Sequence, residues 1–584
     1  MKHVDISCIG YNFLTIRSLV ICSMIIIPAL SNYAIDSPLP VLYRSSASSE
    51  AISTDNTSTS VVLGAQQNTP AMLRMHNTTA TVSLAGEVKA SNLQRPLFKP
   101  ITGINSQESY LTRNFEAYMA AKNQSEFTKP NTTVFEVKPP KIFRTNPNTS
   151  ILAAFEGLSQ NCCFPPDVQL AAGKKYLVEM VNLDGAIYSK KGTLIKTFAL
   201  EPFFNPSLIY REGSKIINEM SDPVVLFDSL SGRWFASISD ITEHSIRVAV
   251  SKTEDPTGIW KIYNVPFTPQ PNNCSDQPFT GISKDKLVIT VNNWGNDCNW
   301  YSDNRPPEFR GVQLIIADKM DLINGIDNVK SMQSESDLNY FSLHPIINIT
   351  PTTTLQIATV GDFGGNTLHV FYIDGPLYEL RTRVLLYHIQ ETHVPPNGVQ
   401  YLAHHIRKFT SEEPRINTGD TRILSGTSYQ GKLWLTFNDG CFIAGDSNSR
   451  SCIRLVQIDT ITNEVLQDFD VGTLASSVYY PAISIDAAGN LGVIFGYSSH
   501  SVYPSILVST RFSTDKSSSI EDPSFLKLGT GNELSNRYGD YFAASYDPSN
   551  TNIIWVAGEY HPAETWSTYI GSVMHMVRTP ESVP

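Results

Sequence analysis

From about residue 160 onward, the chain consists of short apolar or alternating runs separated by glycine, proline, asparagine and aspartate. Apolar runs of this length between turn-forming residues are typical of β-strands, and helical periodicity is almost absent. The pattern therefore predicts an all-β structure from this point to about residue 575.

Seven segments of this region share one plan: a polar residue, often aspartate, then a strand of small residues, a turn and a strongly apolar strand. Self-similarity at a spacing of 54 to 76 residues indicates a repeat architecture. The segments begin at Asp167, Asp222, Asp276, His344, Asp420, Tyr480 and Asp540.

Most of these units continue into a third strand, and some add a fourth. The pattern predicts third strands at 246–250, 312–316, 368–373, 453–458, 503–508 and 566–573, and fourth strands at 260–265 and 384–388. Four antiparallel strands in about 50 residues is the size of a propeller blade. We therefore predict a single seven-bladed β-propeller over residues 149–575. Six or eight blades remain alternatives, because the long third and fourth units could contain further strands. A two-sheet sandwich would need several domains and linkers that the sequence lacks.

The seventh unit ends after its third strand, near Val573. An unclosed ring would leave an exposed sheet edge, which invites aggregation. The segment before the first unit, 149–155 (TSILAAF), is the candidate for the missing strand. We expect this strand to join the two ends of the propeller.

The first 34 residues have the layout of a signal peptide. Lys2 and Arg17 precede a 12-residue apolar run, 19–30, which ends in small and polar residues up to Ala34. This run is shorter than the roughly 20 residues that cross a bilayer as a helix, so cleavage is favoured over an uncleaved anchor. We expect a secreted or cell-surface protein with no membrane span after cleavage.

Residues 35–148 are rich in serine, threonine, asparagine and alanine, and carry only one short possible helix, around 110–121. This composition predicts a flexible extension, and residues 576–584 form a short tail. Seven sequons make the protein a candidate glycoprotein, with acceptors at Asn56, Asn77, Asn123, Asn131, Asn148, Asn273 and Asn348.

The net charge of −11 becomes −12 without residues 1–34, since Lys2 and Arg17 are removed against Asp5. Nucleic acid is therefore not an expected partner, because it requires a basic surface. The charged fraction of 17% is low and aromatic residues are plentiful, which suits a large β-rich core. We expect a monomer.

Six cysteines remain after signal cleavage, which in an exported chain favours disulfides. Cys441 and Cys452 flank a polar loop between two apolar runs, as a hairpin clip would, and Cys274 and Cys298 lie within one repeat. The adjacent Cys162 and Cys163 remain, and a bond between them would be strained, so one of them would pair elsewhere. No Cys-x-x-Cys spacing supports a zinc site.

Several motifs resemble a family of exported β-propeller proteins distantly related to sialidases. They are 165–167 leading to 176–182, 222–228 with 233–234, 255–258, and 537–540 with 566–571. The resemblance covers residues 160–573. It implies the propeller fold but no established substrate or catalytic set, so no active site is carried over.

The link to sialidases rests on the Asp box, Ser-x-Asp-x-Gly-x-Thr-Trp, of which 251–260 (SKTEDPTGIW) and 484–489 (SIDAAG) are degenerate forms. In this turn the aspartate caps backbone amides and the glycine supplies a positive φ. The box therefore indicates the fold and not the chemistry.

Sialidase activity would need an arginine cluster for the substrate carboxylate, a tyrosine with a glutamate and a further acid. The Phe-Arg-Ile-Pro motif is absent, and 413–416 (EPRI) is only a scrambled version. Arg415, Arg422 and Arg537 could converge at the channel, although salt bridges explain isolated arginines more often.

One stretch is rich in histidine and could ligate zinc: His388, His393, His404 and His405, with Glu391. It lacks the i, i+4 spacing of a metalloprotease site, so a solvated loop is the favoured interpretation.

Five units begin with aspartate: Asp167, Asp222, Asp276, Asp420 and Asp540. The first strand of each blade lines the central channel, so these residues should form a ring at one mouth. A carboxylate ring could hold calcium, and with Arg537 it is the candidate ligand site. The alternative, which we favour, is that each aspartate caps the turn entering its own strand.

The sequence favours a binding module for an extracellular glycan, peptide or cell-envelope partner. A secreted sialidase-like glycoside hydrolase is the alternative.

Overall fold

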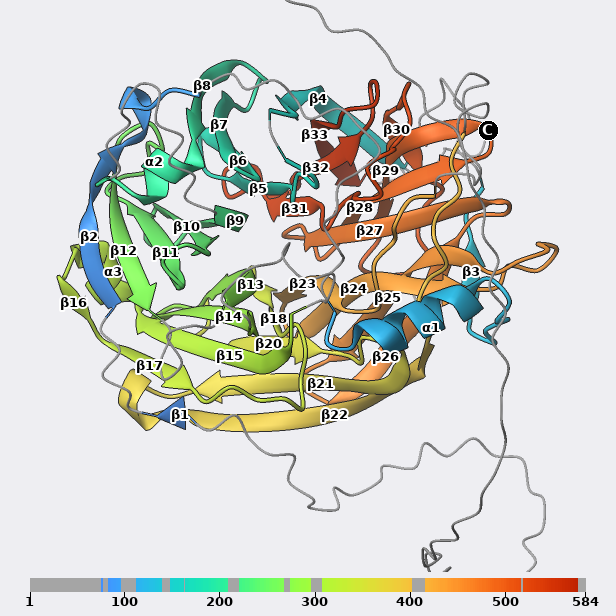
Figure 1. The fold of residues 1–584 in the computed structure, drawn as a ribbon, viewed down its shortest axis with the longest axis horizontal. Helices are drawn as coiled ribbons and strands as arrows, with labels where there is room; N and C mark the ends of the chain where they lie inside the picture. Colours follow the sequence, from blue (N-terminus) through green and yellow to red (C-terminus); the bar gives the residue numbers. More distant parts are fainter. Residues whose placement is uncertain are drawn as a thin grey trace, which may run out of the picture. The chain divides into compact units, whose positions relative to one another are not determined.

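The computed structural model describes residues 75–76, 82–95, 112–138, 148–161, 163–207, 220–266, 274–295, 307–401, 415–515 and 518–575. The strands among these residues form seven sheets, each built on four or more strands. The sheets follow one another around a ring, and the first strand of each lies toward its centre (Figure 1). The prediction of an all-β propeller with four-stranded antiparallel blades is confirmed. The predicted signal peptide, 1–34, and tail, 576–584, lie outside the described residues.

The first four sheets in chain order begin at the repeats that start with Asp167, Asp222, Asp276 and His344. Sheet 1 contains β5 (Gln169–Ala172), β6 (Tyr176–Val181), β7 (Asp184–Ser189) and β8 (Leu194–Ala199). Sheet 2 contains β9 (Met220–Asp228), β10 (Arg233–Asp240), β11 (Ser245–Ser251), β12 (Ile259–Pro266), β2 (Val82–Lys89) and β16 (Asn328–Val329). Sheet 3 contains β13 (Cys274–Ile282), β14 (Lys286–Trp294), β15 (Phe309–Asp318), β17 (Ser331–Ser334) and β1 (Met75–His76). Sheet 4 contains β18 (His344–Pro345), β20 (Leu355–Thr359), β21 (Gly365–Asp374) and β22 (Arg381–Thr392).

The remaining three sheets begin at the repeats that start with Asp420, Tyr480 and Asp540. Sheet 5 contains β19 (Ile347–Asn348), β23 (Ile423–Tyr429), β24 (Lys432–Cys441), β25 (Arg450–Asp459), β26 (Glu464–Gly472) and β3 (Val134–Glu136). Sheet 6 contains β27 (Ser476–Ile485), β28 (Leu491–Ser499), β29 (Val502–Arg511) and β30 (Ser524–Lys527). Sheet 7 contains β31 (Ala543–Tyr546), β32 (Ile554–Tyr560), β33 (Ser567–His575) and β4 (Thr149–Ser159).

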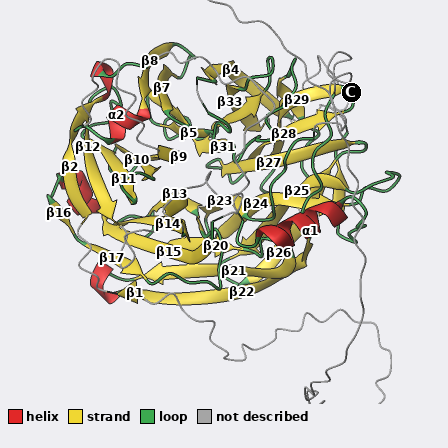
Figure 2. Ribbon diagram, in the orientation of Figure 1, coloured by secondary structure: helices red, strands yellow, loops and turns green. Residues whose placement is uncertain are grey.

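Helices are short and few beside the strands (Figure 2). They are α1 (Phe115–Ser125), α2 (Leu200–Phe204), α3 (Lys319–Asn324) and the 3₁₀ turns η1 (Ala90–Asn92) and η2 (Leu377–Glu379). None of these helices in the described part of the chain is long and apolar enough to cross a membrane.

Each pair of neighbouring sheets encloses its own hydrophobic cluster. Successive side chains of a strand point to opposite faces, so a strand packed on both sides needs an almost continuous apolar run. Trp234 and Phe235 illustrate this: Trp234 packs toward sheet 1 and Phe235 toward sheet 3. The apolar runs of the repeats therefore have their physical origin in the stacking of sheets around the ring.

The ring is closed by the segment predicted for that purpose. Strand β4 pairs antiparallel with β33, from Ser159 opposite Ser567 to Thr149 opposite His575. Its Phe155 lies 5.5 Å from the ring of Tyr188 in sheet 1, and the cluster between sheets 7 and 1 includes Leu158 and Trp555. Both ends of the propeller are thereby joined in one sheet, and the closure prediction is confirmed.

Glu179, in β6, is fully buried at this closure. Its carboxylate accepts hydrogen bonds from the Leu158 amide at 3.1 Å, from the Tyr188 hydroxyl at 3.0 Å and from Thr568. Burial raises the pKa of Glu179 to about 7, and the three hydrogen bonds offset part of this effect. The closure of the ring therefore contains a titratable group.

We expect Glu179→Gln to stabilise the protein increasingly as pH rises. The folded-state pKa lies above the unfolded value, so the contribution of Glu179 to stability is fully present below about pH 4.5 and is lost as pH rises through about 7. The advantage of the variant should approach about 3 kcal/mol above pH 7. Urea unfolding of the variant and the wild type at pH 5 and pH 8 measures this difference in stability, with a substitution at an exposed position, Glu156→Gln, as control. A difference in stability that does not change with pH would contradict the raised pKa of Glu179.

Parts of the N-terminal segment depart from the predicted flexible extension. Strand β2 pairs with β12, β1 with β17, and β3 runs parallel to β26, so all three add to outer strands of the propeller. Outer strands present unpaired backbone groups, and these additions satisfy them. Within the segment 35–148, which is expected to be flexible, residues 82–95 and 112–138 thus carry β2, β3 and α1, and the helix expected around 110–121 is found at 115–125.

Candidate functional site

The inner strands begin with a repeated backbone feature. Five residues at the heads of successive sheets have φ between 47° and 57°, in the left-handed region: Asp167, Asp222, Gln277, Ser342 and Tyr480. At three heads, an asparagine at the end of the second strand of the preceding sheet accepts a hydrogen bond from the backbone amide. The pairs are Asp222 to Asn182 at 3.0 Å, Ser342 to Asn292 at 2.9 Å and Tyr480 to Asn438 at 2.6 Å. Neighbouring sheets are thus fastened to each other at this mouth of the channel.

Two of the predicted aspartates, Asp167 and Asp222, bind neighbouring sheets. Asp167 accepts hydrogen bonds from the Asn182 side chain at 2.6 Å and the Asp540 amide at 3.0 Å. Asp222 accepts from the Gln277 amide at 3.1 Å and the Tyr541 hydroxyl at 2.9 Å. The expectation that each aspartate caps its own strand is therefore wrong for these two, because the backbone amides that they accept from, those of Asp540 and Gln277, belong to adjacent repeats.

Asp420 does cap its own strand, accepting from the Arg422 amide at 3.0 Å. It also forms a two-pronged ion pair with the Arg422 guanidinium, at 2.9 and 2.8 Å. Arg422 is 2% exposed, donates to Gln277 at 2.6 Å and lies 4.6 Å from the centre of the Phe341 ring. Arg537 pairs with Asp540 at 3.1 Å.

The three candidate arginines do not form an unoccupied cluster. Arg422 and Arg537 are paired with aspartates of the mouth, and Arg415 pairs with Glu126 of the N-terminal segment at 3.1 Å. An arginine that is already neutralised by a carboxylate offers less to a substrate carboxylate.

Burial raises the pKa of Asp167 and Asp276 well above the usual range, and Asp222 raises both further. Arg422 and Arg537 act in the opposite direction on Asp276. The carboxylate of Asp276 has no hydrogen-bond partner among the described residues, in contrast to the carboxylates of the other four aspartates of the ring.

Calcium at the five aspartates finds no geometric support. In the described part of the chain, no group of three or more histidine, cysteine, aspartate or glutamate side chains could hold a metal ion. The oxygens of four of the aspartates are engaged by amides, hydroxyls and guanidinium groups, so they are not directed at a common point. In the histidine-rich stretch, His388 is exposed and His393 half-buried, while His404 and His405 lie outside the described residues.

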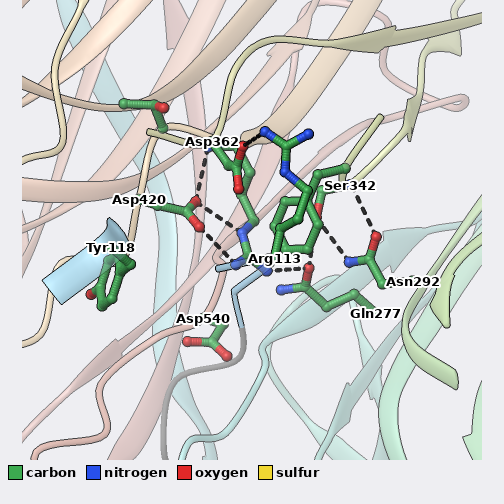
Figure 3. A network of polar contacts seen from close by, with 12 residues as sticks. Arg113, Tyr118, Gln277, Asn292, Ser342, Asp362, Asp420 and Asp540 are labelled. Carbon is green, nitrogen blue, oxygen red and sulfur yellow. Dashed lines mark hydrogen bonds and ion pairs between the residues drawn. The ribbon is translucent and has the colours of Figure 1, made fainter. Parts of the chain in front are cut away.

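Helix α1 lies at the mouth. Nothing in the sequence indicated that this helix would contact the channel. Tyr118 lies beside Asp420, and Arg113 pairs with Asp362 at 2.8 Å (Figure 3). The helix begins after Asn114, whose side chain accepts from the Ala117 amide at 3.0 Å. An asparagine at this position is a common helix start, and it is the one local signal that could have strengthened the helix prediction.

A cavity of 160 Å³ lies further along the inner strands. All seven sheets line it, through residues such as Ala172, Val225, Phe279, His344, Thr427, Ile483 and Ser545. No aspartate, glutamate, lysine or arginine is among the lining residues. Burial lowers the pKa of His344 to about 4, so its imidazole is neutral at neutral pH. The cavity is thus uncharged, in contrast to the mouth.

Thr427 is one of the residues that line this cavity, and its side-chain hydroxyl is buried without a partner. The residue is 1% exposed, and its Oγ1 has no hydrogen-bond partner. A buried hydroxyl without a partner costs about 1–3 kcal/mol, so such groups usually serve a ligand or an ordered water.

The disulfide predicted between Cys441 and Cys452 is present, with both residues fully buried and their Cα atoms 5.8 Å apart. Cys163 and Cys274 are also disulfide-bonded. Cys162 and Cys298 lie outside the described residues, so the pairing of Cys274 with Cys298 stays a prediction.

The sequons differ in accessibility. Asn123 and Asn131 are exposed and Asn348 is half-buried. Asn148 is 4% exposed and donates to Glu521 at 2.8 Å, so its side chain is inaccessible in the folded protein. Asn56, Asn77 and Asn273 lie outside the described residues.

No protein-family model and no curated protein matches this chain. Similar solved structures include a protein of unknown function from Dyadobacter fermentans DSM 18053, at 10% identity and TM-score 0.34, covering 74% of this chain and 100% of that one. Trypanosoma rangeli sialidase is similar at 9% identity and TM-score 0.31, covering 74% and 59%. The NanB sialidase of Streptococcus pneumoniae is similar at 11% identity and TM-score 0.35, covering 68% and 82%. The structural neighbours of this propeller therefore include sialidases.

Proposed function

We propose that this chain is a secreted or cell-surface binding protein that holds a neutral sugar residue of a glycan in the cavity of its propeller channel. The observation that carries the proposal is the uncharged lining of this cavity, which includes Thr427, a residue whose buried hydroxyl has no hydrogen-bond partner. Export rests on the signal-peptide pattern of residues 1–34.

The composition of the lining suits a sugar ring. Phe279, Phe542 and Tyr546 supply aromatic surface, while Thr280 and Ser545 supply hydroxyls. Binding sites for small ligands are concave, largely apolar and carry a few placed polar groups. The volume of 160 Å³ is close to the roughly 150 Å³ of a cavity that holds one benzene ring, so we expect no more than one sugar residue to enter.

A sialidase-like hydrolase is the second candidate, and the charge distribution disfavours it. Sialic acid carries a carboxylate, which would need cationic partners, whereas the cavity has none. The arginines nearest the mouth, Arg422 and Arg537, are already paired with Asp420 and Asp540.

A glycan array probed with the mature chain, beside a panel of glycosidase substrates, tests the proposal. We expect binding to neutral glycans and no turnover. Turnover of sialylated substrates, or binding restricted to sialylated glycans, would refute it and favour the hydrolase. Absence of binding to any glycan would also refute it.

Thr427→Val should weaken the binding of a neutral glycan found on the array about fivefold, which corresponds to the loss of about 1 kcal/mol from one hydrogen bond. The melting temperature should stay the same or rise, because an unpartnered hydroxyl is replaced by a methyl group. Isothermal titration and thermal unfolding measure the two effects.

Thr436→Val is the matched control. Thr436 is fully buried in β24 but donates to the Arg454 carbonyl at 2.8 Å and does not line the cavity. This variant should lose about 1 kcal/mol of stability and keep its affinity. Equal affinities of Thr427→Val and the wild type would place the ligand elsewhere.

A further inference from the structure

Helix α1 is held on the propeller mainly by polar contacts. Lys122 donates to Thr418 Oγ1 at 3.0 Å and to the Gly419 carbonyl at 2.8 Å. The Tyr118 hydroxyl donates to Asn417 at 3.2 Å, and Arg113 pairs with Asp362 at 2.8 Å. The contacts of Lys122 and Tyr118 reach the residues just before Asp420, at the head of the fifth repeat.

The start of the helix segment, with Arg113 and Tyr118, lies at the acidic mouth of the channel (Figure 3). The carboxylates of this mouth are Asp167, Asp222, Asp276, Asp362, Asp420 and Asp540, and its cations are Arg422 and Arg537. The helix segment adds two cations to this acidic surface, Arg113 and Lys122, while its Glu116 is exposed and its Glu126 pairs with Arg415. Tyr118 lies beside Asp420 at this mouth (Figure 3).

The apolar part of the docking is small. Tyr118 and Val394 are the buried members of the cluster, with Phe115, Ala121 and Phe363 partly buried beside them. Each pair of neighbouring sheets, by contrast, encloses a cluster of a dozen or more buried residues. An isolated helix of 11 residues is shorter than the roughly 12–15 at which helices become marginally stable in water. The helix therefore depends on the propeller, while the propeller core does not depend on the helix.

Lys122 makes the docking less favourable than its hydrogen bonds suggest. It is 8% exposed, and burial lowers its pKa to about 7, with Asp420 acting in the opposite direction. A lysine in such a position loses solvation of its ammonium group when the helix docks.

We propose that α1 is a detachable intramolecular cover of the acidic mouth, held by Arg113 and Lys122, and that the uncovered mouth binds helical peptides that present two cations in the same arrangement. Undocking frees Asp362 from Arg113 and exposes Thr418 and Gly419 beside Asp420, while all sheets stay folded. Access to this end of the channel is thereby controlled separately from the uncharged cavity of the proposed function.

Hydrogen exchange on the full chain tests detachment without any substitution. Amides of α1 should exchange at least tenfold faster than those of β24 and β25, which lie in the sheet beneath. The double variant Arg113→Ala/Lys122→Ala should increase exchange in α1 a further tenfold and leave β24 and β25 unchanged. Met119→Gln, at a 38% exposed position of the same helix, should behave as the wild type. Exchange of α1 only at the rate of the strands would overturn the proposal.

A labelled synthetic peptide of residues 112–128 tests the uncovered mouth. It should bind the full-length double variant at least tenfold more tightly than the wild type, whose mouth is occupied. The same peptide with alanine in place of Arg113 and Lys122 should not bind. Equal binding to both chains, or no binding to the double variant, would overturn the proposal. Failure of the peptide leaves the glycan assay unaffected, so the two proposals can fail independently.

Discussion

Deletion of residues 149–156 should abolish the single cooperative unfolding transition of the propeller. These residues form most of β4, which supplies the outer strand of sheet 7 and places Phe155 against Tyr188 of sheet 1. Loss of a buried phenylalanine side chain alone typically costs about 3–5 kcal/mol, and domains are stable by only about 5–15 kcal/mol. Removal of the whole strand should leave the ring open at β33.

Thermal and urea unfolding, followed by circular dichroism and tryptophan fluorescence, measure this effect. We expect transitions that no longer coincide between the two probes, at a lower midpoint. Replacement of 149–156 by eight glycine and serine residues keeps the chain length and should behave like the deletion. Leu152→Ser, at a 49% exposed position of β4, should unfold like the wild type. A deletion variant that melts as the wild type does would show that β4 is dispensable for closure.

Arg454→Met should destabilise the protein by about 3–5 kcal/mol. Arg454 is fully buried in sheet 5, where its guanidinium binds Asp439 at 2.6 Å, Asp468 at 2.9 Å and Asp470 at 2.6 Å. Removing the one cation leaves three carboxylates, two of them fully buried, with no counter-charge. The loss should be smaller at pH 5 than at pH 8, because unpaired buried carboxylates have raised pKa values and can take up protons.

Urea unfolding at the two pH values gives this difference. Lys432→Met is the control, because Lys432 is 43% exposed and its ion pair with Asp459 lies at the surface. That pair should contribute less than about 1 kcal/mol. A loss of the same small size in Arg454→Met, at either pH, would contradict the role of Arg454 as the counter-charge of this cluster.

The repeats could be predicted from the sequence because the pattern of apolar residues that indicates them is local. Each strand is buried on both faces, so every repeat carries two or more apolar runs, as Trp234 and Phe235 illustrate. The closing strand was also predictable, since the seventh repeat lacks its outer strand and 149–155 has a strand pattern without a partner in the first repeat.

The docking of the N-terminal segment on the propeller could not be predicted from the sequence. Its composition is typical of a flexible chain, and its strands β2 and β3 gain order from edges that lie more than 150 residues away in sequence. Likewise, Lys122 of α1 binds Thr418 and Gly419 about 300 residues further on. Local periodicity contains no information on such partners.

The sequence by itself determined that the chain repeats a four-stranded β unit and places aspartates at the heads of five units, because hydrophobic alternation and turn residues act within a few positions. Only the tertiary structure decided what those aspartates do. Asp222 accepts hydrogen bonds from Gln277 and Tyr541, and Asp420 pairs with Arg422. The contacts of Asp222 form because the ring places separate repeats at one mouth of the channel. The charge of a site depends on which residues lie together in the fold. The acidic mouth and the uncharged cavity therefore exist only in the closed ring, where residues of all seven repeats line one channel.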